Sequence, residues 1–164
     1  MTTSAENGFS LMEVLVSIFV LAVGVVGAVG MQLTALRTSQ HSALQTKALH
    51  LAVEMADAMS AHSAATQSNP YIGIDYPASA SHATEPAGFD IQYFLERIAR
   101  DLPDARLRIC RDAQPWDSAR RQYRWDCMHA PHAAIAIKIA WAGKEADAVA
   151  PAPVVVLMLA LGST

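Results

Sequence analysis

Residues that could carry chemistry lie in three separate parts of this 164-residue sequence. The carboxylate of Glu13 stands among apolar residues close to the start. Two cysteines, Cys110 and Cys127, enclose 16 residues in the second half. Arginines and aromatic residues are interleaved between positions 97 and 125. These features suggest, in turn, a charge that needs a cation, a covalent cross-link and a surface that attracts anions.

The sequence around Glu13 has the length and polarity of a membrane segment. From Val14 to Leu36, 23 residues pass without an ionisable side chain. As a helix they would extend about 35 Å, slightly more than the ~30 Å hydrocarbon core of a bilayer. A carboxylate in such a helix costs on the order of 3 kcal/mol and usually has a specific partner. A cut between Gly8 and Phe9 would create one, because the new α-amine would lie one helical turn from Glu13, or reach it from a neighbouring copy. Alternatively, Glu13 simply lies at the lipid interface.

A cleaved secretory signal is the competing interpretation of this segment. Such signals have a basic start, a short apolar region and a small-residue cleavage site. The first eight residues, MTTSAENG, contain no Lys or Arg, and the GAVG stretch at 27–30 resembles a cleavage site only loosely. Because the apolar region is also too long, we expect the segment to remain as an anchor.

The junction of Gly8 and Phe9, followed by SLMEVLV with Glu13 as the fifth residue after the junction, resembles the class III signal of type IV pilins and type II secretion pseudopilins. The resemblance implies that an inner-membrane prepilin peptidase cuts after Gly8 and methylates the amine of Phe9. It gives Glu13 a role in peptidase recognition or in subunit registration during assembly. Residues 1–8 would be the leader, and residues 9–36 the transmembrane and assembly half of a long helix.

The segment departs from the family in two respects. Family leaders usually carry Lys or Arg before the Gly, whereas Glu6 is the only charged side chain here, so the orientation of the chain follows from the resemblance. Major pilins often have a proline in the apolar half, whereas this sequence has Gly24, Gly27 and Gly30. Each glycine lowers helix propensity by about 1 kcal/mol relative to alanine. The three could permit local melting or close packing of helices.

An amphipathic half, residues 37–67, continues the predicted helix. Apolar residues recur at helical spacing as far as Met59, and no proline occurs before Pro70. One helix from Phe9 to about Ala65 is therefore expected. The stretch KALHLAVEMADAMSAHSAATQSNPY is similar to the end of this helix in minor pilins of the PilV kind, the type IV pilus modification proteins. Type II pseudopilins share only the first half of the pattern.

Residues 68–164 are predicted to form a periplasmic α+β region packed on residues 37–67. Residues 72–88 are rich in Ala, Ser, Pro and Gly and indicate a connecting loop. A helix is expected at 89–102, and strands are expected at 105–109, 135–141 and 154–161. The last of these is apolar on both faces, which is typical of a strand covered on both sides. Together the patterns favour an α+β, pilin-like fold with a long N-terminal helix on a small antiparallel sheet.

Cys110 and Cys127 have two interpretations. If this region lies outside the cytoplasm, one disulfide is the simplest, and closing such a loop would stabilise the fold by roughly 3 kcal/mol. Alternatively, Cys127, His129 and His132 are close enough in sequence to bind a metal with Cys110 as fourth ligand. The oxidising compartment and the loose spacing favour the disulfide, so we expect no metal.

Eight of the twelve basic residues lie between positions 97 and 124, namely Arg97, Arg100, Arg106, Arg108, Arg111, Arg120, Arg121 and Arg124. With Trp116 and Trp125, the last three could contact phosphates and stack on bases. Five aspartates between positions 97 and 126 reduce the net charge of that window to +3. A solvated or subunit-contacting face is therefore favoured over a DNA-binding surface.

No Gly-rich phosphate loop, nucleophile elbow or zinc-protease helix occurs, so we expect neither an enzyme nor a cofactor. The resemblance to minor pilins implies a subunit that enters or primes a type IV pilus and supports adhesion or motility. Its partners would be the prepilin peptidase, the other minor pilins, the major pilin and the inner-membrane assembly platform. Before assembly it would cross the inner membrane once. A minor pseudopilin of type II secretion and a pilus-associated DNA receptor are the alternatives.

Overall fold

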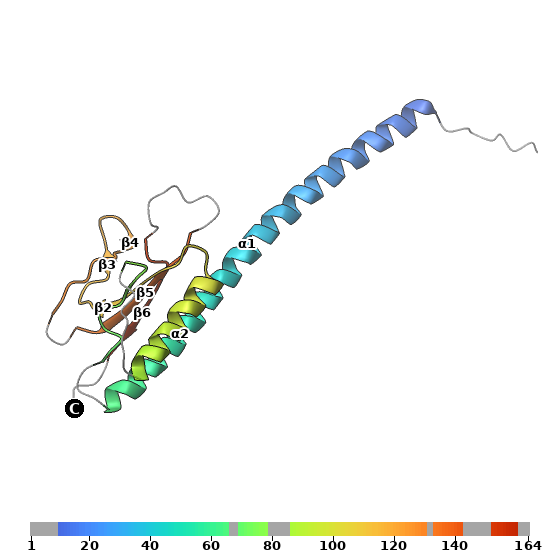
Figure 1. Cartoon of the computed structure of the whole chain (residues 1–164). Helices are drawn as coiled ribbons and strands as arrows, with labels where there is room; N and C mark the ends of the chain where they lie inside the picture. Colours follow the sequence, from blue (N-terminus) through green and yellow to red (C-terminus); the bar gives the residue numbers. More distant parts are fainter. Residues whose placement is uncertain (1–9, 66–68, 79–85, 131–132, 143–151, 161–164) are drawn as a thin grey trace, which may run out of the picture. The chain divides into compact units, whose positions relative to one another are not determined.

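The computed structural model describes residues 10–65, 69–78, 86–130, 133–142 and 152–160 (Figure 1). The predicted roles of Gly8, Phe9 and His132 fall outside these residues. The chain divides into two compact units, with the boundary between Ser42 and Ala43. Helix α1 (Leu11–Ala65) contributes its first part to one unit and its second part to the other.

In the first unit, the described residues are Ser10 and the first part of α1, which is apolar as far as Leu36. The helix begins after Ser10, whose carbonyl oxygen accepts hydrogen bonds from the amides of Glu13 and Val14 at 3.0 and 3.3 Å. The hydroxyl groups of Ser17 and Thr34 donate to carbonyl oxygens one turn earlier in the helix, so neither polar group is left unpaired. The large apolar side chains from Leu11 to Leu36 are exposed. By length and composition, α1 can cross a membrane.

The second unit combines the end of α1 with a shorter helix and two antiparallel sheets (Figure 1). Helix α2 is Pro86–Asp101. The main sheet has the order β1-β2-β5-β6, and its strands are Asp75–Tyr76, Arg106–Arg111, Ile135–Ala140 and Val155–Leu159. A small hairpin pairs β3 (Trp116–Asp117) with β4 (Gln122–Tyr123). This arrangement confirms the predicted α+β fold with a long N-terminal helix packed on a small antiparallel sheet.

The hydrophobic core lies between the two helices and one face of the main sheet. The strands present alternate residues to this core, because side chains of a strand point to its two faces in turn. The large buried members from α1 and α2 are Leu51, Met55, Met59, Ile91, Phe94, Leu95 and Ile98, and those from the central strands are Leu107, Ile109, Ile135, Ile137 and Ile139. The helical spacing of the first group and the alternation of the second explain why these segments fold together.

The opposite face of β5 is also buried, although its residues are small or charged, whereas on that face of β2 Cys110 is buried and Arg106 and Arg108 are half-buried. Here Cys110 lies opposite Ala136, and Arg108 lies opposite Lys138. Residues 112–130, called the excursion below, leave the end of β2 and include the β3–β4 hairpin. Every residue of β5 is buried as a result, including Lys138.

Two local expectations were wrong. The loop expected at 72–88 contains β1, which pairs with β2 through Asp75 and Tyr76, and α2 already begins at Pro86. The last strand was expected to be covered on both sides, but β6 is an edge strand and Met158 is 40% exposed. Apolar composition alone does not distinguish a central strand from an uncharged edge strand.

Candidate functional site

Glu13 lies in the first turn of α1, where the unpaired amides of a helix favour a negative charge. Glu13 is exposed, and the hydroxyl of Ser17 donates a hydrogen bond to the backbone carbonyl oxygen of Glu13 at 2.7 Å. Within the described part of the chain, no basic side chain lies at ion-pair distance from its carboxylate. The cation predicted to pair with this carboxylate is therefore not among the basic side chains of the described residues.

The three glycines of α1 are not required by contacts inside the described chain. A Cβ atom added at Gly24, Gly27 or Gly30 would meet no other atom within 4 Å. Glycine lowers helix stability at such positions. The close approach of another helix and local flexibility, the two alternatives that the sequence leaves open, both stay predictions.

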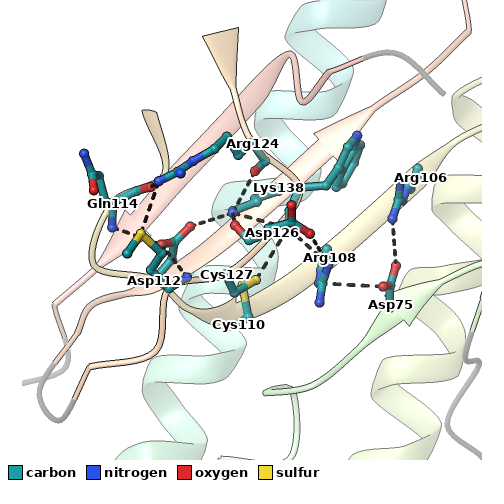
Figure 2. The surroundings of a disulfide bond; sticks show 12 residues. Asp75, Arg106, Arg108, Cys110, Asp112, Gln114, Arg124, Asp126, Cys127 and Lys138 are labelled. Atoms are coloured by element: carbon teal, nitrogen blue, oxygen red, sulfur yellow. Dashed lines mark hydrogen bonds and ion pairs between the residues drawn. A yellow bond between two sulfur atoms is a disulfide. The ribbon is translucent and has the colours of Figure 1, made fainter. Parts of the chain in front are cut away.

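A disulfide joins Cys110 at the end of β2 to Cys127 in the excursion, with the Cα atoms 6.3 Å apart (Figure 2). Both sulfurs are thus in a covalent bond and are not thiolate ligands, while His129 is exposed. Among the described residues, no group of three or more His, Cys, Asp and Glu side chains could hold a metal. The bond closes the segment that carries the hairpin and four of the eight arginines between positions 97 and 124.

A buried ion pair beside the disulfide was missed by the sequence analysis. The ammonium of Lys138 donates to the carboxylate of Asp112 at 2.6 Å, and neither side chain is exposed. It also donates to the carbonyl oxygens of Arg124 and Asp126 at 2.8 and 2.9 Å. Figure 2 shows these groups converging next to the two cysteines. The available signal was a single lysine among apolar residues in the sequence IAIKIA, because a strand covered on both faces buries that lysine as well.

Asp112 is held as a carboxylate by its surroundings. Burial would by itself raise the pKa of this group, but the hydrogen bonds from Lys138 and from the amides of Gln114 and Met128 outweigh it and lower the pKa. The two amides donate to the same carboxylate oxygen, at 3.0 and 3.1 Å. Asp112 therefore connects the start and the end of the excursion.

Most arginines of the predicted basic surface are engaged within the chain. Arg106 and Arg108 lie 3.8 and 3.6 Å from the carboxylate of Asp75, and Arg97 pairs with Glu54 at 2.8 Å. Buried or half-buried pairs of this kind position elements of the fold and leave less charge available for a partner.

The five residues proposed for a nucleic-acid or partner surface differ in their local contacts. Arg120 pairs with Asp117 at 3.3 Å, and Arg121 is exposed at the turn of the hairpin with a φ of 54°. Arg124 turns inward and donates to the carbonyl oxygen of Gln114.

The aromatic members of that surface also contact other side chains of the chain, although Trp116 is 43% exposed. Trp116 meets Tyr123 edge to face, with ring centroids 5.0 Å apart. The guanidinium of Arg106 lies 4.2 Å from the centre of the Trp125 ring. Such contacts stabilise the excursion and cover one face of the Trp125 ring.

A model of the prokaryotic N-terminal methylation motif matches residues 3–29, less than a fifth of the chain. The comparisons with curated proteins and with solved structures give no match. The motif, the apolar start of α1 and the α+β second unit support a type IV pilin-like protein, a pilin or pseudopilin subunit of pilus or secretion assembly. Proteins with this motif are structural subunits, and the motif implies processing by a prepilin peptidase and assembly with other pilins.

Proposed function

We propose that this chain is a minor pilin of the PilV kind, cut after Gly8 by a prepilin peptidase and methylated at the new amine of Phe9. The match of the methylation motif to residues 3–29 is the observation that carries the proposal. The exposed apolar side chains of α1 support it, because an apolar helix of this length needs lipid or other helices around it. The sequence at the end of α1, LAVEMADAM, favours the PilV kind.

Glu13 acts during the assembly of subunits, when its carboxylate pairs with a cation. The carboxylate is costly in an apolar surrounding, and the amine of Phe9 in a neighbouring subunit neutralises it. The attraction is strong at this place because few water molecules compete with it. Only a subunit in the correct axial register brings the two charges together, so the pair selects the register while the apolar surface supplies most of the association energy.

The subunit is first a single-pass protein of the inner membrane, with residues 68–164 in the periplasm. It then leaves lipid for a fibre at the assembly platform, together with the other minor pilins and the major pilin. The disulfide fits a domain outside the cytoplasm, where such bonds persist.

Deletion of the gene and complementation test this function. Loss of the subunit should reduce surface pili, adhesion or motility, and the complementing protein should be found in sheared pili. Export of secreted enzymes should be unchanged. Normal pili together with a loss of export would instead identify a type II secretion pseudopilin.

A role as a DNA receptor gains no support from the arginines, because most of them pair within the chain. We propose that Trp116, Arg120 and Arg121 belong to a surface that contacts neighbouring subunits. Salt-dependent binding of duplex DNA that weakens in the variant R120A/R121A would favour the receptor instead.

A further inference from the structure

The buried ammonium of Lys138 holds the chain immediately before Cys127. Lysine has three N–H donors, and here they have three close acceptors: the carboxylate of Asp112 and the carbonyl oxygens of Arg124 and Asp126. The side chain of Lys138 is completely buried on β5, a central strand of the sheet. These contacts therefore fix the approach to Cys127 against a rigid element.

Asp112 connects the two segments that carry the cysteines. It follows β2 two residues after Cys110, and one of its carboxylate oxygens accepts from the amide of Met128, the residue after Cys127. The other oxygen contacts Lys138 at 2.6 Å. Noncovalent contacts thus reach the residues on both sides of Cys127, and none of them needs the disulfide as a link (Figure 2).

We propose that the Asp112–Lys138 pair aligns the two cysteine-bearing segments before oxidation, so that Lys138 is a positioning residue for the Cys110–Cys127 disulfide. The reduced chain then already holds the excursion on the sheet. The disulfide adds a covalent bond between two segments that the ion pair has already aligned. This inference concerns the folding of the second unit and does not depend on the proposed role in pili.

The chemistry follows from the exposure of the two cysteines. Cys127 is half-buried, whereas Cys110 is only 5% exposed, so Cys127 reacts first with an outside disulfide such as oxidised glutathione. The Cys127 thiolate attacks one glutathione sulfur, forms a mixed disulfide and releases one glutathione thiolate. The Cys110 thiolate then attacks the Cys127 sulfur and releases the second. Two electrons pass to glutathione, and the two cysteine protons end on the released thiols.

The second step is intramolecular, so it depends on how closely Cys110 is held to the mixed disulfide. This dependence is expressed as an effective concentration of one thiol at the other. If the ion pair aligns the segments, its removal lowers that effective concentration. If the disulfide itself orders the excursion, the loss of the ion pair changes the effective concentration little.

The test uses the full chain in detergent micelles, equilibrated with mixtures of reduced and oxidised glutathione. Thiol alkylation and mass measurement give the oxidised fraction at each ratio. In the variant K138M we expect the effective concentration to fall about 10-fold or more. The matched control is R120M, which removes an exposed charge that pairs with Asp117 in the same excursion, and it should stay within about 2-fold of the native chain. An unchanged value in K138M, or equal losses in both variants, would overturn the proposal.

A measurement on the native sequence covers the case in which K138M does not fold. Hydrogen exchange is followed in the full chain before and after reduction of the disulfide. We expect the amides of Gln114 and Met128 to remain protected after reduction, because their acceptor is Asp112. Loss of their protection on reduction, whether β5 stays protected or unfolds with them, would show that the disulfide orders the excursion.

Discussion

At the scale of residues, Lys138 and Glu13 are two charged side chains that stand among apolar residues in the sequence. They differ in whether the described chain supplies an oppositely charged partner. Lys138 is satisfied within the chain by a carboxylate and by carbonyl oxygens of the excursion. Glu13 is exposed at the start of α1, and within the described residues no basic side chain lies at ion-pair distance from its carboxylate. The first charge therefore serves folding, whereas for the second we propose a role in assembly.

Replacing Glu13 should separate membrane insertion from assembly. The variant E13A removes a carboxylate that costs on the order of 3 kcal/mol in an apolar environment, so insertion should be at least as efficient as in the native chain. The amount in sheared pili should fall strongly, because the amine of Phe9 loses its partner. Immunoblots of membranes and of sheared pili measure both quantities. S17A, which removes a hydroxyl bonded to the Glu13 carbonyl, is the matched control; equal incorporation of E13A and S17A would contradict the pairing.

Asp112 predicts how stability depends on pH. Its pKa in the folded chain is lower than the ordinary value of 3.8, so its contribution is fully present well above 3.8 and is lost as the pH falls through 3.8 and then through the lowered pKa. The free energy of unfolding should therefore decrease between about pH 5 and pH 2, and the decrease should be smaller in D112N. Chemical unfolding at each pH measures it. D126N, at a side chain that is 97% exposed, should retain the native slope; an equal slope in D112N would contradict the assignment.

At the scale of elements, α1 and α2 hold the sheet mainly through apolar contacts. Met59 is fully buried, so M59A should cost about 2 to 5 kcal/mol of unfolding free energy. R97A breaks the half-exposed pair between Arg97 and Glu54 and should cost at most about 1 kcal/mol. Urea unfolding in micelles gives both values. L49A, at a residue 49% exposed on α1, is the control for M59A, and similar losses in M59A and L49A would disprove the assigned core.

The glycines of α1 allow a second test at this scale. The triple variant G24A/G27A/G30A meets no steric obstacle within the described chain and gains about 1 kcal/mol of helix propensity at each position. Helicity and membrane insertion should be retained or improved, whereas incorporation into pili should fall. Circular dichroism and immunoblots of sheared pili measure the two effects. Normal incorporation would show that neither close packing nor local melting needs these glycines.

The sequence was sufficient to predict the elements whose periodicity is strong. Leu107 and Ile109 alternate as a strand does, and Leu51, Met55 and Met59 follow helical spacing, so β2 and the second half of α1 were expected from residue order. The two-residue strand β1 was missed because its pairing with β2 is a long-range contact without a local pattern. Lys138 was missed although it is a single lysine among apolar residues, because only the path of the excursion makes its side of β5 an interior.

At the scale of the whole molecule, the two units differ in what surrounds their apolar side chains. The described part of the first unit carries exposed apolar side chains that require lipid or other helices, and the second has its own core, a disulfide and a buried ion pair. The apolar helix and the methylation motif point to a subunit that changes its surroundings once, from membrane to fibre. Surfaces that select neighbouring subunits have no short sequence signature, so the position in the fibre could not be predicted.

The N-terminus of the mature chain tests the central claim most directly. Intact mass and N-terminal sequencing are measured on protein from membranes, with and without an active prepilin peptidase. We predict a chain that begins at N-methylated Phe9 only when the peptidase is active, and an uncut chain otherwise. Retention of Met1 in the presence of the peptidase, or a start near Gly30, would contradict processing as a pilin.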